Sequence, residues 1–457
     1  MKFCWTQLIL CIVLIIYILV RFNNISNRIR FAWDEERDAF QIHDIIKNGK
    51  LTLLGPRVVG VSGFFLAPYH TYLLAPFYLI SNLNPLVIIV FVSVYNLVFF
   101  FVSKIIITKK WSNKHTTLFL LFWALNPLLI SSDITAWNVL LIPLGILLQI
   151  YLLILIQDSP TTKKWLALGL LNGIMINLHF QFIFPILFST IFLLKIVNIS
   201  RSYLKGVFFS FLGFLLTLLP LLIFDLRHNF LNLNLFANFF FSKTSSSLSV
   251  NFDWLSSFSN SLKSLTIFSS IVTTALFLLV FLFVVFFVYK HSFGYMKRIY
   301  FSIGVMILFT SIFFSIYSQQ TPEYYYIFLF PYIYLVLVEF FLIHKAEYFL
   351  VFFILLSSIL NHDLQRALAP SADSVGYKIQ VVEYIQDKYH KKRFNISLNT
   401  DPGRNSGYYY LINYYKLTTD SSPDNPLIEI VIPPSRDAIN DEILGVGLKV
   451  PEELRLQ

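Results

Sequence analysis

Charge and cysteine are scarce in this sequence. Of its 457 residues only 13% are charged and 56% are hydrophobic, and its two cysteines, Cys4 and Cys11, both lie in the first apolar segment. This composition excludes an ordinary soluble domain, and the position of the cysteines excludes a disulfide framework. Zinc-ligand spacing, a glycine-rich phosphate loop, a Ser-His-Asp order and internal repeats are also missing, so the common enzyme signatures assign no activity.

Long apolar runs take up most of the chain. Runs of about 20 residues recur, and a helix of that length crosses the roughly 30 Å of a bilayer's hydrocarbon core. The first run begins like a signal peptide, with Lys2 before an apolar stretch, but no small-residue cleavage site follows it, so we interpret it as an uncleaved anchor. The predicted spanning segments are 3–20, 85–107, 116–130, 139–156, 165–178, 182–197, 204–224, 265–289, 299–317, 324–343 and 348–360.

The basic residues indicate which loops share a side of the membrane. Another apolar stretch, 64–80, is interrupted by Pro68 and Pro76. If it lies in the interface rather than spanning, all lysine-rich loops fall on one side, which the positive-inside rule makes cytoplasmic. We therefore predict eleven spanning helices, an internal N-terminus and an external C-terminus. The lysine-rich loops are 104–114, 163–164, 195–205, 290–298 and that of Lys345, and the loops predicted to be external contain Asp34, Asp133, Asp225 and Glu323.

The net charge of +10 is explained by these loops, so no nucleic-acid partner is expected. The tail differs from the rest, because its charge density rises and its apolar runs shorten. Apolar residues recur at helical spacing from Val375 to Tyr389, and 394–398 and 427–432 are typical of short strands. The sequence thus predicts an all-α polytopic membrane domain of about 11 helices over 1–361, with a first external loop at 21–84, and a small extracytoplasmic α/β domain over 362–457.

An acidic run just outside the first apolar segment is the strongest candidate for chemistry. It reads Asp34-Glu35-Glu36-Arg37-Asp38 and opens a helix-like stretch. One interpretation is structural: acids favour a helix N-terminus, and Asp34 could be the capping residue. The other is that Asp34 takes a proton from an acceptor hydroxyl at the membrane surface while Arg37 holds an anionic group. A second carboxylate beside it could raise a pKa or help to bind a divalent metal.

With the alanine that follows, this run resembles the Asp-Glu-x-Arg-Tyr-Ala pattern of the GT-C glycosyltransferases, integral-membrane enzymes that use polyprenyl-phosphate sugars. The most similar branches are the protein O-mannosyltransferases, the lipid A aminoarabinose transferases and the bacterial Rgt-type transferases. Asp38 departs from the pattern, which usually has tyrosine there. The resemblance covers roughly 3–360 and includes Gly55-Pro56, the stretch from Ala67 to Tyr72, Trp137-Asn138, the stretch from Leu178 to Gln181, the stretch from Phe224 to Asn229 and the stretch from Pro322 to Tyr326.

The resemblance implies an inverting transfer of a hexose or pentose from a polyprenyl-phosphate donor to a hydroxyl of a lipid, glycan or protein, on the extracytoplasmic face of the cell membrane. It places the base on Asp34 and a supporting role on Glu35, and a divalent metal, if one takes part, on the same two carboxylates. Use of a nucleotide sugar is unsupported. Because negative charge builds on the departing phosphate, nearby cations should stabilise it. The candidates are Arg37, Arg57, Arg227 and His228.

Four further residues are candidate contacts to the donor. His179 and Gln181 lie between two apolar segments, where they either contact sugar or phosphate or form a polar helix–helix turn. Tyr324 and Tyr325 either form a platform for the sugar or belong to an aromatic belt. For Arg227, the alternative to a contact with the phosphate is an ion pair with Asp225 that anchors a loop.

A transporter or flippase for a lipid-linked or polar solute is the alternative function. The polar residues Asn96, Asn126, Asn172 and Asn177 lie within or near the predicted helices and support it. Transporters, however, usually show internal repeats and charged or broken helices near the midplane. Here the charged candidates gather at one face, which favours surface chemistry. A non-catalytic assembly protein with the same fold is a third possibility.

Overall fold

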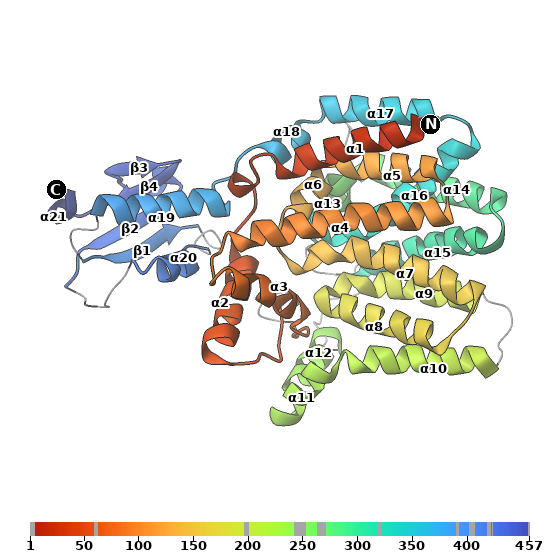
Figure 1. Ribbon diagram of the computed structural model, residues 1–457, viewed down its shortest axis with the longest axis horizontal. Coiled ribbons are helices and arrows are strands. Elements are labelled where there is room, and N and C mark those ends of the chain that lie inside the picture. Colours follow the sequence, from red (N-terminus) through yellow and green to blue (C-terminus); the bar gives the residue numbers. More distant parts are fainter. Residues whose placement is uncertain are drawn as a thin grey trace.

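The computed structural model describes residues 5–58, 63–195, 201–241, 253–262, 271–317, 321–389, 393–401, 407–417, 422 and 424–455. Figure 1 shows a bundle of long helices with a small sheet domain attached at one end. The α-helices are α1 Trp5–Phe22, α2 Trp33–Asn48, α3 Tyr69–Ile80, α4 Val87–Lys110, α5 Asn113–Leu125, α6 Pro127–Asp133, α7 Ile142–Asp158, α8 Thr162–Leu178, α9 Ile183–Leu194, α10 Arg201–Leu216, α11 Leu219–Arg227, α12 Leu231–Phe241, α13 Asp253–Leu262, α14 Ile271–His291, α15 Gly294–Ile316, α16 Phe330–Ile343, α17 Glu347–Leu360, α18 His362–Leu368, α19 Val375–Tyr389, α20 Tyr408–Tyr414 and α21 Glu452–Arg455.

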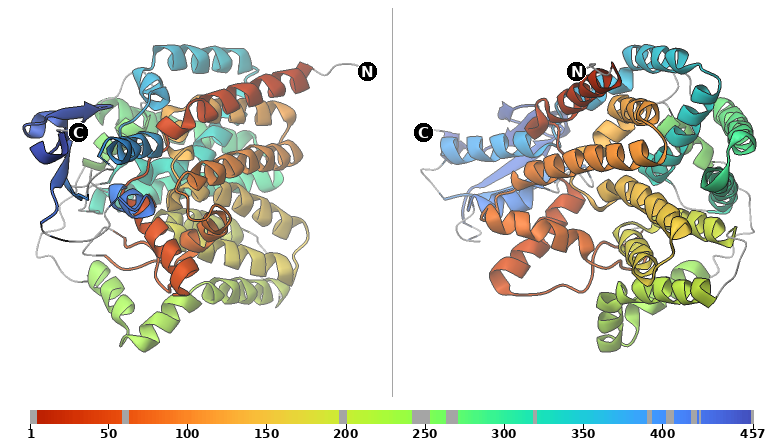
Figure 2. Two further views of the ribbon diagram at one scale, coloured as in Figure 1. Left: turned by 60° about the vertical axis from the view of Figure 1, so that its left-hand side comes forward. Right: turned by 45° about the vertical axis from the view of Figure 1, so that its right-hand side comes forward.

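Short 3-10 helices connect several of these elements: η1 Ile25–Asn27, η3 Asn138–Leu141, η4 Phe180–Phe182, η5 Glu323–Leu329 and η6 Pro434–Arg436. The long helices run side by side, with α8 against α10, α1 against α5, and α15 between α9 and α14. In all the ribbon views α10–α12 lie along one edge of the bundle, and α1 and α17 lie along the opposite edge (Figures 1 and 2).

The protein is an integral membrane protein. By length and composition, five of the described helices can cross a membrane, or up to eight if each bent helix pair is one span. All eleven predicted segments overlap a described helix, although residues 3–4, 196–197 and 265–270 lie outside the described residues. A count of eleven requires the shorter helices α1, α8 and α9 to cross as well. Helix α3 has 12 residues, about 18 Å, and contains Pro76, which agrees with an interfacial position. Helix α9 is as short, but it continues η4, so that its apolar helical run extends over Phe180–Leu194.

The sharpest bend has a local cause. Helices α5 and α6 meet at 80°, at the pair Asn126–Pro127. Proline has no backbone N–H to donate, so it ends α5 and is favourable only in the first turn of α6. The Asn126 side chain accepts a hydrogen bond from the Leu129 N–H at 3.1 Å and so caps the new helix.

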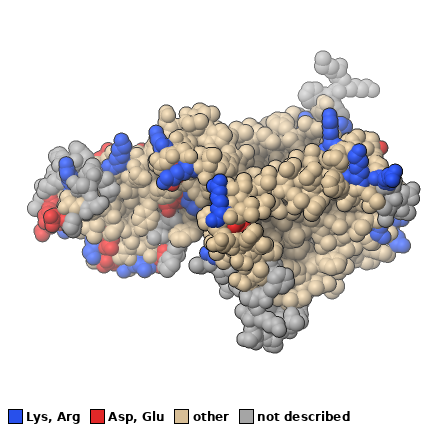
Figure 3. All heavy atoms as spheres, turned by 90° about the horizontal axis from the view of Figure 1, so that it is seen from below, with Lys and Arg blue, Asp and Glu red and all other residues tan. Residues whose placement is uncertain are grey.

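The lysine-rich loops gather at one end of the bundle. Lys110, at the end of α4, pairs with Asp158 at the end of α7 at 3.1 Å, and Lys114, at the start of α5, pairs with Glu347 at the start of α17 at 2.7 Å. Figure 3 shows Lys and Arg at the end farthest from the sheet domain, next to a stretch of surface that carries almost no charge. The uncharged stretch is the surface expected to face lipid.

The C-terminal region forms a four-stranded sheet with helices packed on it. The strands are β1 Asn395–Thr400, β2 Leu427–Ile432, β3 Asp441–Ile443 and β4 Val446–Lys449, in the order β1-β2-β4-β3. β1 and β2 are parallel, whereas β4 is antiparallel to both of its neighbours. The structure therefore has the predicted all-α membrane bundle with a small α/β unit; the predicted strand 394–398 overlaps β1, and the predicted strand 427–432 has the bounds of β2.

This α/β unit holds the segment that leads into α2. The Phe31 N–H donates to the Asp373 carbonyl at 3.0 Å, and the Lys378 ammonium donates to the Phe31 carbonyl at 2.8 Å. At the start of α2, Glu36 Oε1 accepts the Tyr410 N–H at 2.9 Å. Because α2 carries Asp34, the C-terminal unit fixes the position of the candidate base.

Candidate active site

The acid that caps the start of helix α2 is Glu35, not Asp34. Glu35 Oε2 accepts the Ala32 N–H at 2.9 Å and satisfies a backbone donor that the helix leaves free. The Glu35 side chain is fully buried, and this burial raises its pKa, although Arg30, 3.6 Å away, opposes the shift. The capping role that the structural interpretation gave to Asp34 therefore belongs to Glu35. Asp34 remains partly exposed, with 31% of its side chain accessible.

A chain of ion pairs runs from Asp34 into the protein. Arg37 Nη1 contacts Asp34 Oδ1 at 2.7 Å, and Arg37 Nη2 contacts Asp38 Oδ1 at 2.7 Å. The second oxygen of Asp38 lies 2.7 Å from His70 Nδ1 on α3. Burial works to raise the pKa of Asp38, but Arg37 and His70 outweigh it and lower that pKa. Arg37 is thus held between two carboxylates and orients Asp34, which is a different role from the predicted contact to phosphate.

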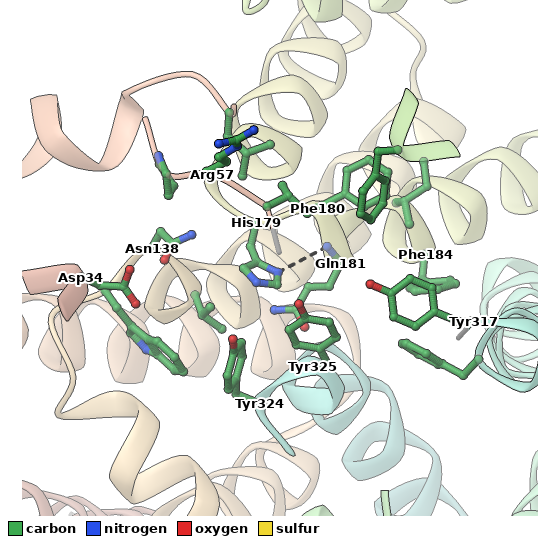
Figure 4. A pocket seen from close by; sticks show the side chains of 18 of the residues that line it. Asp34, Arg57, Asn138, His179, Phe180, Gln181, Phe184, Tyr317, Tyr324 and Tyr325 are labelled. Atoms are coloured by element: carbon green, nitrogen blue, oxygen red, sulfur yellow. Dashed lines mark hydrogen bonds between the residues drawn. The ribbon is translucent and has the colours of Figure 1, made fainter. Parts of the chain in front are cut away.

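The side chain of Asp34 faces a pocket between the ends of several helices (Figure 4). Its cavity volume is about 130 Å³. Polar side chains surround the part nearest Asp34, and aromatic side chains surround the part nearest Phe184. The lining residues are Asp34, Pro56, Arg57, Val58, Leu66, Trp137, Asn138, Val139, His179, Phe180, Gln181, Ile183, Phe184, Phe239, Phe313, Phe314, Tyr317, Tyr324 and Tyr325.

Arg57 is the arginine in the described lining. It lies on a strand-like turn that pairs with Phe65, and its Nε donates to the Gly63 carbonyl at 2.7 Å. Gly55 begins this turn, and a Cβ added there would lie 2.5 Å from the Ala67 carbonyl oxygen, so the close approach of the two chain segments requires glycine. With Nε occupied, the terminal nitrogens of the guanidinium remain to hold an anion in the pocket.

His179 ends α8 at the centre of the pocket. Its Nδ1 accepts the Gln181 N–H at 3.3 Å, and burial lowers its pKa to about 4. The ring is therefore neutral at ordinary pH, and because Nδ1 accepts a hydrogen bond, the single ring proton lies on Nε2. His179 can donate one hydrogen bond from Nε2 to a ligand.

Three hydrogen bonds hold this centre in place. The amide of Gln181, oriented with its nitrogen toward η5, donates to the carbonyl oxygens of Tyr324 at 3.2 Å and Tyr325 at 2.8 Å. The amide nitrogen of Asn138 donates to the Leu178 carbonyl, just before His179. Gln181 therefore positions the tyrosine pair. The sequence assigned no role to Asn138, although it follows Trp137 in one of the quoted motifs.

Tyr324 and Tyr325 lie on η5 and pack against the centre of the pocket. The His179 ring meets both tyrosine rings edge-on, at centroid distances of 6.0 and 5.5 Å. Tyr324 also contacts the Trp137 ring at 4.8 Å. Both tyrosines therefore line the pocket, and a role as a platform for the sugar stays a prediction.

Arg227 and His228 lie outside the lining of this pocket. Both are exposed at the end of α11, and the His228 ring stacks on Phe224. Asp225 does not anchor Arg227; its Oδ1 accepts the Asn232 N–H at 2.7 Å at the start of α12. We therefore assign no contact to phosphate to Arg227 or His228, and Arg57 is the cation among the described residues that line the pocket.

The two predicted metal ligands do not fit a divalent cation. Arg37 contacts Asp34 at 2.7 Å, and Arg30 lies 3.8 Å from Asp34 and 3.6 Å from Glu35. A divalent cation prefers carboxylates that face oxygen ligands, not two guanidinium groups. In the described part of the chain, no three His, Cys, Asp or Glu side chains come together as a metal site.

The bundle, with its first-loop helix and small C-terminal unit, defines a polytopic membrane protein with the GT-C fold. A solved structure of the aminoarabinose transferase ArnT from Cupriavidus metallidurans in the apo state is similar, with a TM-score of 0.55 over 94% of this chain and 93% of that chain at 12% identity. Identity at this level shows the fold alone.

Two other solved structures also resemble the chain. One is the same ArnT bound to undecaprenyl phosphate, with a TM-score of 0.47 and 11% identity over 98% of each chain. The other is the oligosaccharyltransferase of Archaeoglobus fulgidus in complex with Zn and sulfate, with a TM-score of 0.49 and 10% identity over 88% of this chain and 61% of that chain. No family model and no curated protein sequence matches the chain.

Proposed function

We propose that this protein is a membrane glycosyltransferase that transfers a sugar from a polyprenyl-phosphate donor to an acceptor hydroxyl, with Asp34 as the base. One observation carries the proposal: a single pocket combines the carboxylate of Asp34, the cation of Arg57 and an aromatic region around Phe184. The carboxylate suits a hydroxyl that is to be deprotonated, the cation suits a phosphate, and the aromatic region suits the first part of a lipid chain. The fold shared with ArnT supports the class of enzyme, and undecaprenyl phosphate, which ArnT binds, is a lipid phosphate of the proposed kind.

The reaction is a direct displacement. The acceptor oxygen attacks the anomeric carbon, the bond from that carbon to the phosphate oxygen breaks, and its electron pair leaves with the lipid phosphate. The hydroxyl proton passes to Asp34 Oδ2, because Oδ1 already accepts from Arg37 at 2.7 Å. Attack opposite to the departing phosphate inverts the anomeric configuration.

The pocket stabilises the charge that develops on the phosphate. Arg57 supplies a positive charge and His179 supplies the Nε2 proton, in a site walled in part by aromatic rings. Donors that are already in place cost little reorganisation as the bond breaks, and a low dielectric strengthens them. Tyr324 and Tyr325 provide the surface on which the sugar rests.

We place the site on the extracytoplasmic face, because the lysine-rich loops lie at the opposite end of the bundle. The direct test uses the full chain in lipid nanodiscs with radiolabelled polyprenyl-phosphate hexoses and pentoses. We expect the wild type to release labelled sugar from at least one donor and to leave polyprenyl phosphate. A protein that consumes none of these donors, while remaining folded, removes the proposal.

A further inference from the structure

Two adjoining cavities lie where the C-terminal region meets the bundle. One has a volume of about 350 Å³ and the other about 390 Å³. Both are lined by α6, by Glu323 at the start of η5 and by the segment from α18 to Asp373. We call them together the junction groove. The residues that line both cavities are Leu128, Ser131, Glu323, Arg366 and Ala367.

The junction groove shares a wall with the Asp34 pocket. Trp137 and Tyr324 line both, and their rings touch at a centroid distance of 4.8 Å. Arg30 lines the groove, lies over the Trp137 ring and approaches Asp34 Oδ2 to 3.8 Å. At the end of the groove next to Trp137, a bound molecule is therefore separated from Asp34 by the Arg30 side chain.

The chemistry of the groove matches a neutral, hydroxyl-rich molecule. Its serine and threonine hydroxyls and its carboxylates can each bond to sugar hydroxyls. Carboxylates and arginines occur in equal number, which gives no attraction for a polyanion or a polycation. An apolar lipid chain would exclude water from these charged groups and offer them no hydrogen bond. The polar residues are Ser131, Ser132, Thr135, Ser371, Asn260, Glu323, Asp363, Asp373, Arg28, Arg30 and Arg366.

We propose that the junction groove binds the acceptor, and that the acceptor is a neutral oligosaccharide whose terminal hydroxyl reaches Asp34 past the wall of Trp137 and Tyr324. The volumes of the two cavities, about 350 and 390 Å³, leave room for more than one unit of a glycan in the groove. The donor occupies the other side of the wall. The acceptor role rests on the proposed function, whereas the binding of an oligosaccharide does not.

The test measures binding separately from turnover. The full chain in nanodiscs is presented to an array of defined neutral and acidic oligosaccharides, to Ser/Thr-rich peptides and to phosphatidylglycerol vesicles. Ser131→Trp fills the groove at an exposed position on α6, and Glu323→Ala removes a carboxylate that lines both cavities. The matched control is Ser435→Trp, which adds the same ring at an exposed position on η6 outside both cavities.

We expect neutral oligosaccharides to bind, both groove variants to weaken binding by roughly tenfold or more, and Ser435→Trp to bind as the wild type does. Binding by peptides or vesicles alone, binding by no member of the array, or wild-type binding by both groove variants would overturn the proposal. Donor consumption is measured in parallel. If the chain binds oligosaccharides but consumes no donor, this inference holds and the proposed function is wrong. If it consumes a donor but binds no oligosaccharide, only this inference is wrong.

Discussion

Arg37 decides which oxygen of Asp34 is available for chemistry. It contacts Oδ1 at 2.7 Å, whereas the ion-pair partner of Oδ2 among the described residues is Arg30, at 3.8 Å. Asp38 holds the far side of the Arg37 guanidinium and is itself held by His70. The departure from the family pattern at Asp38 thus has a structural consequence: an acid in that position fixes the arginine that orients the base.

Asp34→Asn should lower the rate of sugar transfer by on the order of 10²–10⁴. Asparagine keeps the size of the side chain and an oxygen that accepts from Arg37, but it cannot take a proton. Single-turnover transfer by the purified variant gives the rate. Asp44→Asn, at a half-exposed position of the same helix, is the matched control and should be as active as the wild type. A near-normal rate for folded Asp34→Asn would show that Asp34 is not the base.

Arg57→Met should slow sugar transfer by about 10²-fold, because the departing phosphate loses its positive partner in the pocket. Arg227→Met is the matched control. Arg227 is exposed outside the pocket lining, so its replacement should leave the rate and the donor KM close to those of the wild type. The measurement is transfer as a function of donor concentration. A large loss in Arg227→Met with none in Arg57→Met would exchange the roles assigned to the two arginines.

Among residues, the sequence identified the pocket better than it identified the roles within it. Six of its candidates line the pocket. Five of them lie at or between helix ends, which meet on one side of the bundle, and Arg57 lies on the turn between α2 and α3. The direction of a side chain is a different matter. The Arg37 side chain could face the pocket or pair with Asp34 and Asp38. The packing of α2 against α3 decides between these two directions. The six candidates are Asp34, Arg57, His179, Gln181, Tyr324 and Tyr325.

At the scale of elements, the start of α2 depends on a contact between residues far apart in sequence. Lys378 on α19 donates to the Phe31 carbonyl at 2.8 Å from a site in which only 1% of the residue is accessible. A sequence pattern shows that α19 is amphipathic, yet nothing in that pattern says that it packs against the first external loop. Long-range pairing of this kind is set by the fold as a whole.

Lys378 should make stability depend on pH in a window that starts near pH 8. Burial lowers the pKa of Lys378 to about 8, whereas an unfolded lysine titrates near about 10.4. Between these values the unfolded chain keeps a proton that the folded protein has lost. The unfolded state binds more protons, so this group makes the free energy of unfolding rise with pH, by at most about 1.4 kcal/mol per pH unit.

Thermal unfolding of the full chain from pH 7.5 to 10 measures this contribution. Lys378→Met should remove the rise, so the difference between wild type and variant should change with pH. Lys388→Met is the control on the same helix. Hydrogen bonding to Asp441 raises the pKa of Lys388, which keeps its proton throughout, so its replacement should not alter the slope. Parallel curves for wild type and Lys378→Met would exclude a buried, titrating Lys378.

At the scale of the whole molecule, two groups of loops are separated by the length of the bundle. The loops around Asp34, Asn138, His179 and Tyr324 meet in one pocket, and the lysine-rich loops meet at the far end. The sequence predicts this division well, because each crossing reverses the chain and lysines mark alternate loops. It predicts less about the interior. Arg21 and Asp133, expected at the ends of separate segments, form a buried ion pair at 2.6 Å.

The division between the two ends makes the orientation testable with one cysteine at each end. Asn113 starts α5 among the lysine-rich loops and Ser435 lies on η6 of the C-terminal unit, and both are exposed. In a background without Cys4 and Cys11, a membrane-impermeant maleimide applied to intact cells should label Ser435→Cys, and it should label Asn113→Cys only after permeabilisation. Labelling of both from one side would contradict the odd number of crossings. Labelling of Asn113→Cys alone on intact cells would place the Asp34 pocket on the cytoplasmic face, where the positive-inside rule does not put it.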